Sequence, residues 1–84
     1  MSDYYLFTFA STHAAISTHK RLAPSVKAVL MPVLRQISAS CGMAVRVEPD
    51  ALDRALALLE EIPPGTRLYH VEGEQVTPLP DPVR

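Results

Sequence analysis

The sequence predicts an α+β fold in which a four-stranded antiparallel sheet carries two helices on one face. Three observations support this prediction: four short segments rich in aromatic and β-branched residues, two segments with apolar residues at helical spacing, and their order along the chain, β-α-β-β-α-β. That order is typical of the ferredoxin-like split βαβ arrangement. Because unrelated functions share this arrangement, it does not by itself predict any chemistry.

The first half of the chain is predicted to form a strand, a helix and a second strand. Residues 4–9 are apolar on both alternating faces, which indicates an interior strand. A helix is expected over 13–23, after small hydroxyl residues suited to capping, and its apolar side is expected to carry Ala15, Ile16, His19, Leu22 and Ala23. The second strand is expected over 26–31, closed by Pro32.

The second half repeats the pattern after a long connection at residues 33–42. Residues 43–48 alternate between apolar and polar side chains, as a strand with one more polar face does. The second helix is predicted from a stripe that ends at Pro63-Pro64-Gly65 and consists of Leu52, Ala55, Leu56, Leu59 and Ile62. A last strand over 66–71 completes one domain at residues 1–72. The proline-rich tail, 73–84, is expected to add at most a short edge extension.

Composition excludes several classes of protein. Hydrophobic residues make up 48% and charged residues 20% of 84 residues, which is ordinary globular usage and fits a single domain. A net charge of -1 favours neither nucleic acid nor an anionic membrane as a partner. No apolar run approaches the ~20 residues of a membrane span, and the first residues lack the basic region of a secretory signal. We therefore expect a cytoplasmic protein.

The strongest candidate for a chemical centre is Cys41, the single cysteine, which lies in a run of small and polar residues at the end of the 33–42 connection. A lone thiol cannot form an intramolecular disulfide. It is therefore either a small buried apolar group or a thiol kept free for exchange, oxidation or carrying another atom. From composition alone these two interpretations are evenly balanced.

The predicted topology gives this thiol a set of neighbours. In a ferredoxin-like sheet the start of the 43–48 strand lies beside the end of the 4–9 strand, so Cys41 is expected to face Ser11, Thr12 and His13. A helix start carries unpaired N–H groups and a partial positive charge, which can lower the pKa of a thiol. Further binding residues on the loop are expected to be Arg35, Ser38, Ser40 and Gly42.

Several of these residues also have a plain structural interpretation. His13 could be an exposed first-turn residue and Arg35 a solvated loop cation. Gly42 could supply a positive φ or simply clearance. The three histidines do not cluster and there is no CxxC spacing, so we expect no metal site. No glycine-rich phosphate loop, Ser-His-Asp set or carboxylate pair is found either, and no cofactor is expected.

Two segments of the chain resemble a known family. Residues 7–15 (FTFASTHAA) and 35–46 (RQISASCGMAVR), with Pro32 between them, resemble the selenium/sulfur carrier protein-like family of small bacterial proteins. The likeness covers residues 4 to about 71. In this family the cysteine of the Ser-x-Ser-Cys-Gly loop, here Cys41, is the carrier residue. This chain departs from the family pattern at Gln36 and Ala39.

Two hypotheses follow. The resemblance implies a carrier, more than a true enzyme, that holds sulfur or selenium on Cys41 as a persulfide or selenopersulfide between donor and acceptor proteins. The alternative is a ferredoxin-like binding or regulatory module in which Cys41 is structural. Under either hypothesis, the sequence leaves open whether the chain forms a homodimer.

Overall fold

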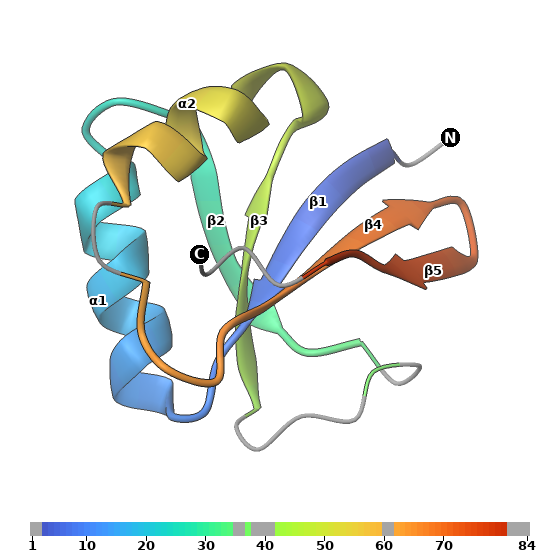
Figure 1. Cartoon of the computed structure of the whole chain (residues 1–84), viewed down its shortest axis with the longest axis horizontal. Coiled ribbons are helices and arrows are strands. Elements are labelled where there is room, and N and C mark those ends of the chain that lie inside the picture. The colour runs from blue at the N-terminus through green and yellow to red at the C-terminus, as the bar shows by residue number, and fades with distance from the viewer. Residues whose placement is uncertain (1–2, 35–36, 38–41, 60–61, 81–84) are drawn as a thin grey trace.

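The computed structural model describes residues 3–34, 37, 42–59 and 62–80. These form β1 (Asp3–Thr8), α1 (Thr12–Leu22), β2 (Ala28–Pro32), β3 (Met43–Val47), a 3₁₀ turn η1 (Pro49–Ala51), α2 (Leu52–Leu58), β4 (Arg67–Glu72) and β5 (Gln75–Pro78) (Figure 1). The strands form one sheet in the order β2-β3-β1-β4-β5, and every neighbouring pair is antiparallel. The α+β class is therefore confirmed, and β1 is an interior strand as predicted.

The strand count of four was wrong, because β5 adds a fifth strand at the edge beside β4. Two residues, Gly73 and Glu74, connect Glu72 to its partner Gln75, and Gly73 has φ +62°. A two-residue hairpin loop that opens on a positive φ favours glycine at that position. The hairpin loop and β5 lie within residues 73–84, the proline-rich tail that was expected to add at most a short edge extension.

The two faces of the sheet are covered differently. Side chains alternate along a strand, so neighbours in β1 belong to opposite faces. One face packs against the helices in a core that includes Phe7, Phe9, Val45, Leu22 and Leu59. The other face, which we call the open face, carries a second apolar cluster built on Tyr4, Leu6, Ala44 and Val71. Figure 1 shows α1 and α2 together on one side of the sheet.

The buried side of α1 differs from the predicted one. Ala15, Thr18 and Leu22 are buried, whereas Ile16 is 38% exposed. Spacings of three and four residues place Ala15, Thr18 and Leu22 on one stripe. Thr18 was not predicted on the buried side of the helix because its side chain is polar. Ile16 instead contributes an apolar side chain to the outer surface of the helix.

The second helix is shorter than its apolar stripe suggested. A 3₁₀ turn precedes it, and α2 ends at Leu58, with Leu59 at φ -91°, ψ 78° outside the helical region. Within the helix only Ala55 is buried, and Leu59 is buried just after it. Ile62 belongs to the following segment, which runs past α1 toward β4.

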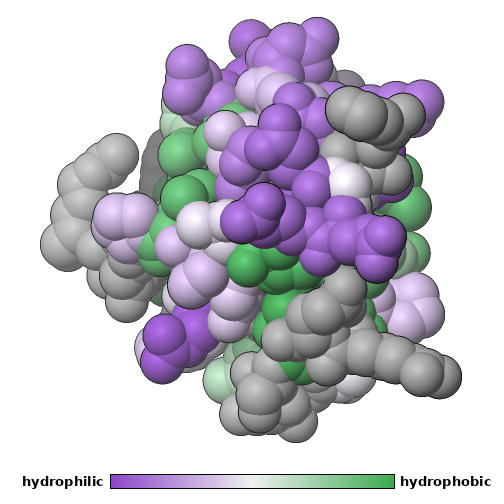
Figure 2. Space-filling model, turned by 90° about the vertical axis from the view of Figure 1, so that its right-hand side faces the viewer, coloured by the Kyte–Doolittle hydropathy of each residue, from purple (hydrophilic) through white to green (hydrophobic). Residues whose placement is uncertain are grey.

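The surface on the side of the β4–β5 hairpin is mixed in character. In Figure 2 green apolar areas on this side are separated by purple hydrophilic side chains. Among the residues of the described ranges, no helix is long and apolar enough to cross a membrane.

Candidate functional site

One end of the sheet brings together segments that are distant in the sequence. Thr8, the last residue of β1, pairs with Ala44 near the start of β3. Ser11 follows Thr8 by three residues and Gly42 precedes Ala44 by two, and both segments lie at the same end of the sheet (Figure 1). The predicted adjacency of the β3 start and the β1 end is therefore confirmed.

Ser11 is the N-cap of α1. Its backbone is extended, at φ -146° and ψ 156°, and its hydroxyl oxygen accepts a hydrogen bond from the Ala14 N–H at 3.1 Å. That bond satisfies one of the N–H groups that the first helical turn leaves without a partner. Thr12 begins the helix and His13 follows, and both side chains are exposed.

Gly42 is an exposed residue directly before β3. Its carbonyl oxygen accepts a hydrogen bond from the Val33 N–H at 3.0 Å, which extends the β2–β3 pairing by one step. Its φ is not positive, and a Cβ built on it would meet no heavy atom of the described residues within 4 Å. Neither of the two roles considered for this glycine is therefore required by the fold.

Four of the predicted site residues, Cys41, Arg35, Ser38 and Ser40, lie outside the described residues. The candidate site therefore stays a prediction as a whole. What the structure does give is the position of the described residues on either side of Cys41, namely Ile37 and Gly42.

Ile37 packs on the open face of the sheet. It is 7% exposed and belongs to the cluster with Tyr4 and Leu6, against which Val33 and Leu34 also pack. Its N–H donates to the Leu34 carbonyl at 3.0 Å. Ile37 therefore anchors the connection to the sheet four residues before Cys41. Sequence analysis missed this anchor, although an isoleucine between polar loop residues was a signal for it.

A third segment supports the start of α1. Gly65 has φ +86°, and a Cβ built on it would lie 2.9 Å from the Ala10 Cβ. The turn that contains Gly65 is closed by Thr66, whose hydroxyl donates to the Pro63 carbonyl at 2.6 Å. From the sequence, Pro63-Pro64-Gly65 was predicted only to end the second helix. The triplet does indicate a turn, but nothing local to it indicates which distant residue the turn meets.

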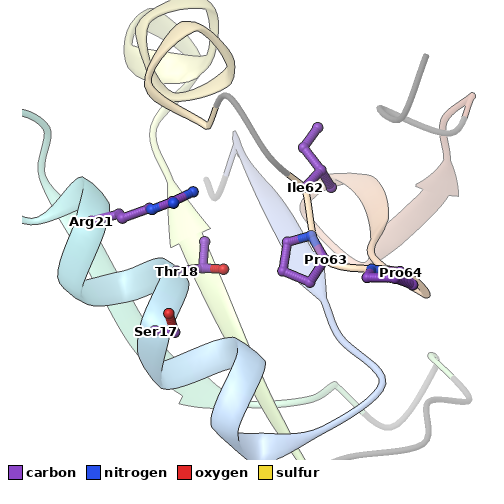
Figure 3. A pocket seen from close by; sticks show the side chains of 6 residues that line it. All are labelled: Ser17, Thr18, Arg21, Ile62, Pro63 and Pro64. Carbon is purple, nitrogen blue, oxygen red and sulfur yellow. The ribbon is translucent and has the colours of Figure 1, made fainter.

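Two hollows lie along α1. The first, of about 420 Å³, is bounded by α1 and by the segment before β4 (Figure 3), and it is lined by Ser17, Thr18, Arg21, Ile62, Pro63 and Pro64. The second, of about 410 Å³, is lined by His13, Ile16, Ser17, Lys20 and Arg21. His13 therefore borders a surface with cationic and apolar side chains.

Two polar clusters lie elsewhere on the sheet. On the open face, Arg46 stacks 4.1 Å above the Tyr4 ring and pairs with Glu48 at 2.9 Å. Arg46 and Glu48 lie two residues apart on the more polar face of the predicted 43–48 strand, and an ion pair this exposed contributes little to stability. The second cluster lies at the end of β1 away from Gly42. There His70 Nε2 lies 2.7 Å from Asp3 Oδ1, and the His70 ring stacks on the Tyr5 ring. The part of the chain described here contains no group of three or more metal-ligating side chains.

Comparison with known proteins identifies the family. The family model described as "Putative Se/S carrier protein-like" matches residues 4–71, which is most of the chain. This chain belongs to that family. Over 66 residues the family member described here is also 42% identical to a selenide, water dikinase of Nitratidesulfovibrio vulgaris (strain DSM 19637 / Miyazaki F). The match covers 79% of this chain and 18% of that relative, so the chain spans less than a fifth of the relative's length. No solved structure matches.

Proposed function

We propose that this chain is a cytoplasmic carrier that holds selenium or sulfur on Cys41. The observation that carries the proposal is the family match, which runs through the segment containing the single cysteine. Similarity to a protein named for selenide supports a role in selenium or sulfur metabolism. We further infer that the scaffold is a ferredoxin-like unit of β1 to β4 with both helices, to which β5 is added.

The proposed loading step is a transfer between sulfur atoms. The Cys41 thiolate attacks the outer sulfur or selenium of a persulfide or selenopersulfide on a donor protein. The new bond to Cys41 forms as the donor's S–S or S–Se bond breaks, and the donor cysteine leaves as a thiolate. The outer atom keeps its proton and no external oxidant is consumed. Delivery repeats the exchange, with an acceptor nucleophile attacking the outer atom and the Cys41 thiolate leaving.

The proposed surroundings of Cys41 favour the thiolate. The start of α1, with its positive dipole end, lies at the same end of the sheet as Gly42, the residue bonded to Cys41. A thiolate is the nucleophile in exchange reactions. We infer that the acceptor is a protein of selenium or sulfur metabolism, because a protein named for selenide contains a region similar to this chain.

Mass spectrometry after incubation with a cysteine desulfurase and its substrate tests the proposal. The expected result is one added sulfur on the peptide containing Cys41, removable by a thiol reductant. The Cys41→Ser variant is the matched control and should stay unmodified. No added sulfur on the wild-type peptide, or equal loading of the variant, would exclude the carrier.

Thiol labelling separates the carrier from a binding module in which Cys41 is structural. A neutral alkylating reagent should label the native carrier rapidly at neutral pH. A structural cysteine would be protected until denaturant is added.

A further inference from the structure

The sheet ends in two edge strands, β2 and β5. Among the described residues each has a strand neighbour on one side only, and Figure 1 shows them on opposite sides of the sheet. Backbone N–H and C=O groups on the outer side of an edge strand can pair with another strand. Which groups point outward on each edge follows from the hydrogen bonds that the strands make inward.

On β2 the even-numbered residues point outward. The Val33 N–H donates to the Gly42 carbonyl, and these two residues continue the register in which Pro32 faces Met43. Both backbone groups of a residue in an antiparallel strand point to the same side, and the side alternates along the strand. Val29 and Met31 therefore bond to β3, whereas Ala28, Leu30 and Pro32 direct their backbone groups to the free edge.

At two of these outward positions, one backbone group is not available for pairing with another strand. The Ala28 carbonyl lies 3.0 Å from His19 Nε2, so α1 already supplies it with a partner. Pro32 has no N–H to donate. Within the described part of the chain, the free edge is left with two donors that have no partner, the N–H groups of Ala28 and Leu30. It also has two acceptors without a described partner, the carbonyls of Leu30 and Pro32.

We propose that β2 pairs with β2 of a second copy of this chain, antiparallel about a two-fold axis at Leu30. In this register the two Leu30 residues exchange N–H···O bonds, and each Ala28 N–H donates to the other copy's Pro32 carbonyl. Each remaining donor and acceptor is used once. The Pro32 nitrogen, which has no hydrogen, faces the other copy's Ala28 carbonyl, which already has His19 as its partner. The missing donor and the occupied acceptor therefore face each other, and no hydrogen bond is lost.

The side chains of β2 are compatible with this pairing. Val29 is 43% exposed and lies on the open face, where the two-fold register would place it opposite Met31 of the second copy. Apolar cross-strand pairs of this kind stabilise a sheet. Residues 28–33 carry no charge, so an antiparallel copy meets no like-charge repulsion within the strand. A two-fold interface requires such self-complementarity.

The β5 edge does not offer the same groups. The Leu79 N–H donates to the Leu68 carbonyl, which continues the β4–β5 register, so Val76, Pro78 and Pro80 are the outward positions. Two of the three are prolines without a donor. Prolines on an outward-facing edge block pairing, and β5 is protected in this way.

Sedimentation or light scattering over a concentration series tests the proposal. The wild-type chain should shift from monomer to dimer, and Val29→Lys should weaken the dimer roughly tenfold or more, because it places charge in the pairing strand. Thr77→Lys puts the same charge on β5 and should dimerise like the wild type. A monomer up to millimolar concentration overturns the proposal, as does equal weakening by the two lysine variants.

Amide hydrogen exchange of the wild-type protein tests the register without any substitution. Exchange of the Ala28 and Leu30 amides should slow roughly tenfold or more between dilute and concentrated samples, because only the dimer bonds them. A dimer in which these two amides exchange as fast as in the monomer would place the interface elsewhere and overturn the proposal. Neither readout depends on Cys41, so a failure here leaves the carrier function untouched, and the reverse also holds.

Discussion

Gly65 and Ala10 approach each other so closely that a Cβ on Gly65 would lie 2.9 Å from the Ala10 Cβ. The contact joins the turn before β4 to the connection between β1 and α1. It therefore supports the helix start that borders the candidate site. The glycines of this chain form a graded series in which the consequence of this contact can be measured.

Gly65→Ala should lower the free energy of unfolding by about 2 kcal/mol or more, since it combines a positive φ with a steric clash. Gly73→Ala has the positive φ alone and should cost about 1 kcal/mol. Gly42→Ala has neither and should stay within about 0.5 kcal/mol of the wild type. Urea denaturation measures all three. Equal losses of unfolding free energy for Gly65→Ala and Gly73→Ala would show that the Ala10 contact is unimportant for stability. Combined with Gly65→Ala, Ala10→Gly should restore part of the lost stability.

Ser11→Ala should destabilise the protein by about 1 kcal/mol, because it removes the hydroxyl that accepts from the Ala14 N–H. Ser17 is exposed on the same helix and serves as the control. Ser17→Ala should change the free energy of unfolding by less than about 0.5 kcal/mol. Thermal or urea unfolding measures the stability of the two variants. If Ser11→Ala is as stable as the wild type, the Ser11 hydroxyl does not stabilise the start of the helix.

Ile37→Ala should destabilise the protein by about 2 kcal/mol, because Ile37 is buried in the open-face cluster. It should also change the rate at which Cys41 is alkylated, since the anchor precedes Cys41 by four residues. Val71→Ala removes bulk from the same cluster but lies on β4, so it should lose stability without changing the alkylation rate. If both variants label like the wild type under native conditions, Ile37 does not position the cysteine.

His13→Ala should slow alkylation of Cys41 near neutral pH if the start of α1 flanks the thiol, because a histidine beside a thiol favours the thiolate. His70 provides the control, since it pairs with Asp3 at the other end of β1. His70→Ala should leave alkylation unchanged. A pH profile of labelling that is the same for His13→Ala and the wild type would contradict the predicted neighbourhood.

The sequence predicted the order of the helices and strands from β1 to β4 because each carries its own periodic signal. It failed where tertiary context decides. Ile16 looked like a core residue, but the helix turns Thr18 to the sheet and leaves Ile16 exposed. Because of Pro78 and Pro80, the sequence predicted at most a short edge extension here, and not the fifth strand β5. These prolines are acceptable because they face outward on an edge.

For the candidate site, chain order predicted that the β1 end lies beside the β3 start, since the split βαβ pattern fixes strand neighbours. It could not predict that Ile37 anchors the connection to the open face or that Gly65 meets Ala10. The apolar Ile37 among polar loop residues was a local sign of burial, but no local pattern specifies its partners on the sheet or indicates that Gly65 meets Ala10.

The carrier function is tested most directly by the rate of sulfur loading onto Cys41 as a function of pH, followed by mass spectrometry with a persulfide donor. We expect loading on Cys41 alone, with a midpoint below the pKa of about 8.5 typical of a free thiol, because we propose that the start of α1 lies near the thiolate and stabilises it. Absence of sulfur on Cys41, or loading that begins only above that value, would contradict the account.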